Sequence, residues 1–243
     1  MSTTRLGTTT CTGAGAALAT ALLLLCACGS EQPATLPPAL DAGPGPVSRY
    51  LPLAVGATWT YHEVDTATGF SAERVTTVEA FEDVGPSHPG MQAFRVRVDK
   101  LYDSSTFWEG YQGDLTVRYR NDDFGASGAL VERQSNAPAR LKLDESAAHL
   151  SPGAVYTLTW LETSTDASGL SSTQNKTEQW SVIAARERVT VPLGTFDDVL
   201  HVRRLNTESA AQKTKDYWYV RGIGKIKELG GGQSEELTAY TTP

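Results

Sequence analysis

Residues 57–64 read Ala-Thr-Trp-Thr-Tyr-His-Glu-Val, and their large side chains recur with a period of two. Trp59 and Tyr61 share one face of an extended chain, while Thr60 and His62 lie on the other. This alternation is typical of a strand with one buried and one hydrated face. The same period recurs in four further stretches: 94–98, 115–120, 156–160 and 217–220.

Glycine-containing turns separate these stretches, at 68–69, 89–90, 168–169, 193–194 and 230–232. Together they predict about ten to twelve strands in antiparallel hairpins, with only a turn or two of helix near 145–149. We therefore expect an all-β domain whose antiparallel sheets form a sandwich or a half-closed barrel. The side chains predicted to be buried are Trp59, Val96, Trp108, Tyr156, Val202 and Trp218.

The chain matches itself at several points. Gly56-Ala-Thr-Trp-Thr-Tyr is similar to Gly153-Ala-Val-Tyr-Thr-Leu, and Phe94-Arg-Val-Arg is similar to Leu200-His-Val-Arg. The order is the same in both halves, although the spacings drift by several residues. Two interpretations stay open: a duplication with repeats at 50–130 and 150–240, or two unrelated β-meanders of similar composition.

The N-terminus has the pattern of an export signal. Residues 14–27 are a short apolar run ending in small residues, preceded by the single charge of Arg5. Leu25-Cys26-Ala27-Cys28 resembles the lipobox of bacterial lipoproteins. The resemblance implies that 1–27 is removed by signal peptidase II, which recognises Leu25, Cys26 and Ala27, and that Cys28 is acylated. The alternative is an ordinary secretory signal with chance cysteines.

The mature chain would keep one cysteine, Cys28, so it cannot form an internal disulfide. Acylation would protect that thiol in an oxidising envelope, and several acyl chains anchor a protein stably. Residues 28–49 are rich in proline and predict a tether, and the β domain is expected over 50–243. By resemblance to Gram-negative lipoproteins, Gly29 in place of aspartate favours the outer membrane.

Three apolar and turn-rich stretches, 50–61, 191–199 and 217–227, resemble landmarks of a group of bacterial secreted and lipid-anchored proteins. That group has no assigned activity, so the resemblance implies a β-rich fold and an envelope location, but no reaction. A weaker likeness of architecture links the domain to half-barrel lipoprotein carriers of the LolA and LolB type.

The formal net charge of −7 argues against a nucleic-acid partner, which would favour a basic face. The same acidic charge argues against electrostatic binding to anionic lipid head groups. The only membrane contact expected is therefore the one made through lipid on Cys28. The most basic stretch contains Lys213, Lys215, Arg221, Lys225 and Lys227. Because acids flank it, we interpret this stretch as a solvated strand face rather than an anion site.

The sequence shows no clustered chemistry. The histidines His62, His88, His149 and His201 lack metal-ligand spacing, and no nucleophile elbow or phosphate loop is present. The acid pairs at 122–123 and 197–198 lack the pattern of a calcium loop. We therefore predict no metal, no cofactor and no enzymatic activity.

The aromatic side chains suggest where a ligand would bind. Trp59, Trp108, Trp160 and Trp218 are candidate ligand-facing residues on a curved sheet, although core packing would equally explain them. We favour a non-enzymatic binding or scaffold domain. Two alternatives stay open: a carrier of a hydrophobic ligand or acyl chain, and a hydrolase built on distant carboxylates such as Glu109 and Asp216.

Overall fold

A computed structural model describes residues 49–100, 102–207 and 213–243. The predicted signal peptide, the lipobox with Cys28 and the tether up to residue 48 lie outside these residues. Within the described ranges the chain forms strands and one 3-10 helix, and no helix there is long and apolar enough to cross a membrane.

Twelve strands follow one another along the described chain, in agreement with the predicted ten to twelve. They are β1 (Thr58–Asp65), β2 (Ser71–Asp83), β3 (Gln92–Asp99), β4 (Ser104–Gln112), β5 (Leu115–Phe124), β6 (Leu130–Asp144), β7 (Val155–Asp166), β8 (Ser171–Val191), β9 (Gly194–Asn206), β10 (Lys213–Val220), β11 (Gly224–Gly230) and β12 (Gln233–Thr241). The 3-10 helix, η2 (Ala147–His149), lies where the sequence predicted a helical turn.

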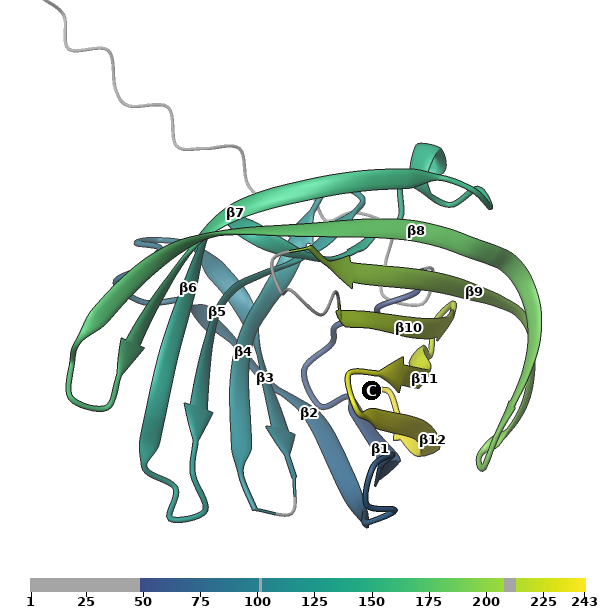
Figure 1. Cartoon of the computed structure of the whole chain (residues 1–243), viewed down its shortest axis with the longest axis horizontal. Coiled ribbons are helices and arrows are strands. Elements are labelled where there is room, and N and C mark those ends of the chain that lie inside the picture. Colours follow the sequence, from purple (N-terminus) through teal and green to yellow (C-terminus); the bar gives the residue numbers. More distant parts are fainter. Residues whose placement is uncertain (1–48, 101, 208–212) are drawn as a thin grey trace, which may run out of the picture. The chain divides into compact units, whose positions relative to one another are not determined.

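Each strand pairs antiparallel with its neighbour in the sequence, and β12 pairs with β1 to close a barrel (Figure 1). The predicted all-β, antiparallel fold class is thus confirmed. The closure extends from the pair Thr58–Thr241 to the pair Asp65–Gln233, so the whole of β1 is hydrogen-bonded to β12. The single sheet closes on itself through β1 and β12, and this distinguishes it from a sandwich or a half-closed barrel.

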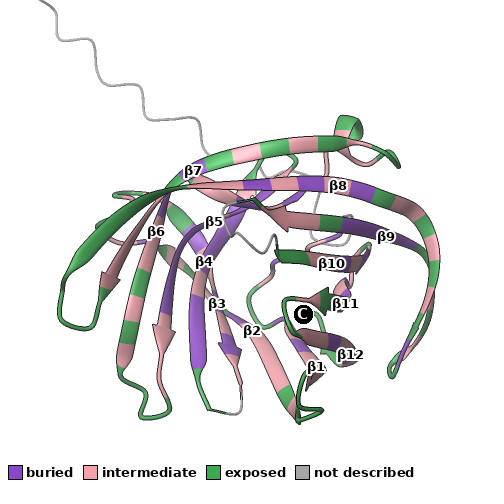
Figure 2. Ribbon diagram, viewed as in Figure 1, coloured by how far each residue is buried: buried purple, intermediate pink, exposed green. Residues whose placement is uncertain are grey.

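Alternation along the strands explains most of the burial, which Figure 2 maps onto the ribbon. In β1, Trp59 and Tyr61 are buried, as the period of two predicts. In β10 the buried residues are Tyr217 and Tyr219, whereas Trp218 between them is half-buried. Of the six side chains predicted to be buried, Trp59, Val96, Trp108 and Val202 are buried, and Tyr156 and Trp218 are half-buried.

The buried apolar residues form two clusters. One includes Trp180, Tyr119 and Leu200, and the other includes Trp59 and Ile226. Each cluster gathers side chains from strands far apart in the sequence, which is how a barrel buries its apolar surface without a second layer.

The segment before β1 belongs to the domain. The Arg49 side chain is buried, its Nη2 donates to the carbonyl of Gly113 at 2.7 Å, and its own carbonyl accepts from the amide of Gly222 at 2.7 Å. The amide of Tyr50 donates to Glu145 Oε2 at 2.9 Å. Arg49 and Tyr50 are therefore tied to the barrel by hydrogen bonds.

The two halves share backbone details. The amide of Gly56 donates to the carbonyl of Val78 at 2.8 Å, and the amide of Gly153 donates to the carbonyl of Val182 at 2.8 Å. The strand register shifts at matching points in both halves, after Val78, Val182, Trp108 and Trp218. These matches are what a duplication would leave behind.

Duplication remains a prediction, and superposing the backbone of 54–120 on that of 151–230 checks it. We expect the five strands β1–β5 to overlay the five strands β7–β11, with the shifts after Trp108 and Trp218 coinciding. If the strands overlay only after the register shifts are offset, the halves are unrelated meanders.

Candidate functional site

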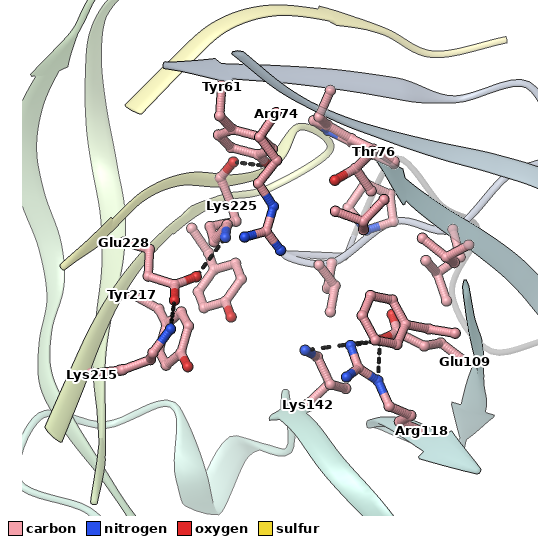
Figure 3. Close-up of a pocket in the computed structure, with 18 of the residues that line it drawn as sticks. Tyr61, Arg74, Thr76, Glu109, Arg118, Lys142, Lys215, Tyr217, Lys225 and Glu228 are labelled. Atoms are coloured by element: carbon pink, nitrogen blue, oxygen red, sulfur yellow. Dashed lines mark hydrogen bonds and ion pairs between the residues drawn. The ribbon is translucent and has the colours of Figure 1, made fainter. Parts of the chain in front are cut away.

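A cavity of about 270 Å³ lies among the strands (Figure 3). Residues of the entering segment, Leu51 to Leu53, form part of its wall together with Trp59 and Phe107. Its charged lining is strongly unbalanced, with seven cations and two carboxylates: Arg74, Arg118, Arg140, Lys142, Arg204, Lys215, Lys225, Glu109 and Glu228. The cavity is thus a polar chamber inside an otherwise acidic protein.

The first group of charges is the Arg118 cluster, which we define as Arg118, Arg140, Lys142 and Arg204 with Glu109 and Glu178. Arg118 donates from Nε and Nη2 to Glu109 Oε1 at 2.9 and 2.7 Å. The Arg118 guanidinium also lies over the Phe107 ring, 3.5 Å from its centroid. Two hydrogen bonds and an aromatic face therefore fix this guanidinium in place.

The remaining cations of the Arg118 cluster make fewer or longer contacts with carboxylates. Lys142 Nζ lies 3.8 Å from Glu109 Oε1. Arg140 Nη2 donates to Glu178 Oε1 at 2.7 Å, and Arg204 Nη1 lies 3.4 Å from the same oxygen. Arg140 follows the point at which β6 leaves β7, since these strands pair only up to Ala137. Its ion pair with Glu178 of β8 therefore bridges this part of the wall.

The second group is the Lys225 cluster, which we define as Arg74, Lys215 and Lys225 with Glu228, Glu235 and Glu63. Lys225 Nζ donates to Glu228 Oε2 at 2.6 Å and to Glu235 Oε2 at 2.5 Å. Lys215 donates to the other oxygen of Glu228 at 2.5 Å, and Arg74 donates to Glu235 at 2.6 Å. Figure 3 shows four members of this group across the cavity from Glu109, Arg118 and Lys142: Arg74, Lys215, Lys225 and Glu228.

The pKa shifts follow the balance of charge in each cluster. Burial alone would lower the pKa of Lys225, but Glu228 and Glu235 outweigh it and raise that pKa. In the Arg118 cluster, burial, with Arg118, Arg140 and Arg204 close by, pulls the pKa of Lys142 well below its usual range. Glu109 offsets this only in part. The cationic form of Lys225 is therefore stabilised in the Lys225 cluster, and that of Lys142 is destabilised in the Arg118 cluster.

Both lining carboxylates are held ionised. Burial would raise the pKa of Glu109, but Arg118 and Lys142 hold it below its usual value. Burial would likewise raise the pKa of Glu228, and Lys225 and Lys215 lower it well beyond that effect. Neither carboxyl keeps a proton near neutral pH.

The four candidate tryptophans are divided by the structure. Trp59 lines the cavity, whereas Trp108, Trp160 and Trp218 do not. The reason is the strand alternation: Phe107 and Glu109 of β4 line the cavity, so Trp108 between them points to the other side. The same holds for Trp218 between Tyr217 and Tyr219. The aromatic side chains facing the cavity are mainly tyrosines.

The basic stretch of 213–227 is divided between the cavity and the rest of the barrel. Lys215 and Lys225 line the cavity and pair with carboxylates, whereas Lys213, Arg221 and Lys227 are not among the lining residues. The interpretation of a solvated strand face is therefore wrong for these two lysines. Charge alternation could have indicated that one side of β10 and β11 is polar, but not which side faces inward.

The predicted carboxylate pair is not brought together. Glu109 lines the cavity, but Asp216 is outside its lining and accepts hydrogen bonds from Arg203 at 2.9 and 3.2 Å. His201 lies 3.0 Å from both Asp216 and Glu187, one carboxylate at each ring nitrogen, and stacks on Trp218. Among the described residues, no three His, Cys, Asp or Glu side chains are arranged to hold a metal ion.

Comparisons with known proteins give no family: no family model and no curated protein matches the chain. One similar solved structure is described as an exported protein with a YmcC-like fold from Bacteroides fragilis, with 11% identity, a TM-score of 0.45 and coverage of 79% of this chain and 98% of that one. Another is described as a lipoprotein from Parabacteroides distasonis, with 13% identity, a TM-score of 0.34 and coverage of 80% and 99%. Similarity this distant carries no argument about function.

Proposed function

We propose that this chain is a lipid-anchored envelope protein whose barrel binds a small polar ligand and catalyses no reaction. The observation that carries the proposal is the charged cavity of about 270 Å³ inside the barrel. Its volume is just below the range of typical ligand pockets, roughly 300–1,000 Å³, so only a small ligand would fit. Buried ion pairs often stabilise a fold less than apolar packing would, so their concentration around a cavity favours a binding role.

A polar ligand fits the cavity better than an acyl chain. Seven cationic side chains line the wall, and an acyl chain would offer them no hydrogen-bond acceptor. It would also displace any water that solvates them, leaving the charges buried without compensation. The wall contains one tryptophan, Trp59, rather than the four that an apolar pocket was expected to use.

A carboxylate hydrolase is disfavoured by the charge state of the lining acids. General acid catalysis by a carboxyl group requires a raised pKa. The pKa values of Glu109 and Glu228 are both lowered, because each carboxylate accepts hydrogen bonds from cations. The two carboxylates therefore act as counter-ions in this proposal.

The anchor rests on the lipobox, and the mature chain is expected to begin at acylated Cys28 on the outer membrane. Cys28→Ala should abolish lipid-dependent cleavage, so the precursor keeps its signal peptide. Cys26→Ala is the matched control, because it keeps a small residue before the cleavage site and should be processed normally. Mass spectrometry of the N-terminus decides, and an unmodified N-terminus elsewhere would refute the anchor.

Ligand binding is tested on the mature lipoprotein in detergent. Native mass spectrometry should show a non-covalent adduct that is released on denaturation, whereas the acyl groups on Cys28 stay attached. A small polar adduct supports the proposal. Repeated recovery of a non-covalent fatty acid or phospholipid would overturn it in favour of the carrier.

A further inference from the structure

The excess positive charge of the cavity is confined to one cluster. In the Lys225 cluster, three cations face three carboxylates, since Glu63 also lies 3.5 Å from Arg74. In the Arg118 cluster, the only carboxylates within 4 Å of the four cations are Glu109 and Glu178 among the described residues. Two positive charges of the Arg118 cluster are therefore uncompensated by the described residues that line or contact the cavity.

Hydrogen-bond donors are left over at the same place. Among the described residues, Lys142 donates no hydrogen bond, and its nearest carboxylate oxygen, of Glu109, is 3.8 Å away. The Arg140 Nε is buried without a described partner. Arg204 reaches Glu178 only at 3.4 Å. Buried donors without acceptors destabilise a fold, so a ligand that supplies acceptors would be bound strongly.

The cations are held in position before any ligand arrives. Arg118 is fixed by Glu109 and by the Phe107 ring, and its side chain is 11% exposed. Arg140 is fixed by Glu178 and lies over the Trp160 ring, 5.3 Å from its centroid. Such preorganisation reduces the conformational entropy lost on binding.

We propose that the Arg118 cluster is the binding site for a doubly charged oxyanion group, a phosphate or sulfate, carried by a small molecule in the cavity. This inference rests on the proposed binding function and names its ligand class. With Lys142 protonated in the complex, two negative charges match the excess, and planar guanidinium groups pair well with tetrahedral oxyanions.

The binding test uses sulfate, inorganic phosphate and glucose 6-phosphate as probes on the mature lipoprotein, with isothermal titration calorimetry. All three should bind, and tighter binding of the sugar phosphate would identify an ester rather than a free anion as the ligand. Lys142→Met should weaken binding about tenfold or more, the effect of losing one charge-assisted hydrogen bond. Its melting temperature should rise by about 2–4 °C, because a poorly compensated, half-buried cation is removed.

Lys227→Met is the matched control, since its side chain is 27% exposed, as is that of Lys142, but is not part of the cavity lining. It should bind all probes like the wild type. Equal binding by Lys142→Met and the wild type would overturn the proposed site, and so would the absence of binding by every probe. If native mass spectrometry then found a neutral polar ligand, the binding function would stand and only the anion class would fail.

Proton uptake separates a binding role for Lys142 from a structural one. A bound anion raises the pKa of Lys142, so sulfate binding should take up protons. The affinity for sulfate should therefore fall as pH rises from the pKa of Lys142 in the free protein to its pKa in the complex. The groups facing Lys142 are Arg118, Arg140, Arg204 and Glu109. Calorimetry in two buffers of different ionisation enthalpy measures the uptake, which should vanish in Lys142→Met. Uptake that persists in the variant would contradict the assignment.

Discussion

Replacing Glu109 by glutamine is expected to lower the free energy of unfolding by about 3–5 kcal/mol, the usual effect of removing one partner of a buried ion pair. Glu109 is 5% exposed and accepts both hydrogen bonds that Arg118 donates to it. Glutamine keeps the shape but removes the charge, so four cations would face Glu178 alone. Urea unfolding of the mature protein at neutral pH measures the loss.

Glu236→Gln is the control for the Glu109 variant. Glu236 accepts a hydrogen bond from Lys227 at 2.7 Å, but the two side chains are 33% and 27% exposed. Solvent screens such a pair, so its loss should change the stability by about 1 kcal/mol or less. A Glu109 variant as stable as the Glu236 variant would show that the cluster does not need this carboxylate.

The same variant should change the response to acid. The pKa of Glu109 is lower in the folded protein, so its stabilising effect is present above the unfolded pKa, about 4.3, and is lost as pH falls through the folded value. The gap in stability between wild type and Glu109→Gln should therefore narrow as pH falls below about 4. A gap that stays constant down to pH 3 would mean that the charge of Glu109 has no role.

Sulfate should partly restore the variant. With Glu109 neutralised, the Arg118 cluster has three uncompensated cations, so the anion should bind the variant more tightly than the wild type. Ligand that binds only the folded state stabilises it by mass action. Unfolding of both proteins with and without sulfate measures the difference.

The period of two was sufficient to predict the fold class. Trp59 and Tyr61 alternate with polar residues, and both are buried in β1. Closure of the barrel was not predictable, because pairing of β1 with β12 joins residues at opposite ends of the domain. The sequence carries no local signal for such a long-range contact.

The charged cavity was missed because alternation does not show which face of a strand is inside. Arg118 alternates with Val117 and Tyr119, and this pattern predicts an apolar inner face and a hydrated outer face. In β5 all three residues are instead buried or half-buried, and Arg118 is the one that lines the cavity. In a barrel with a polar interior, the polar residues of a strand can face inward. The three-dimensional structure is needed to show which face is inside.

Trp59→Ala is expected to lower the free energy of unfolding by about 3–5 kcal/mol, as for other large-to-small changes of a buried tryptophan. The side chain is 5% exposed and packs with Leu53, Val78 and Ile226 in one apolar cluster. Its indole Nε1 also donates to the carbonyl of Ile223 at 2.5 Å. Alanine would leave a void and an unsatisfied carbonyl.

Trp218→Ala separates burial from residue type, because Trp218 is half-buried and stacks on His201 at the strand face away from the cavity. We expect a clearly smaller loss of unfolding free energy there, and equal losses would refute the burial argument.

Trp59 links β1 to the turn before β11, and β1 is also the strand that pairs with β12. Its removal should therefore loosen the barrel at its closure first. Hydrogen exchange should rise in β1 and β12 before it rises in β4 and β5, since local opening follows the weakest packing. A uniform rise across all strands would mean that Trp59 supports the whole barrel rather than its closure.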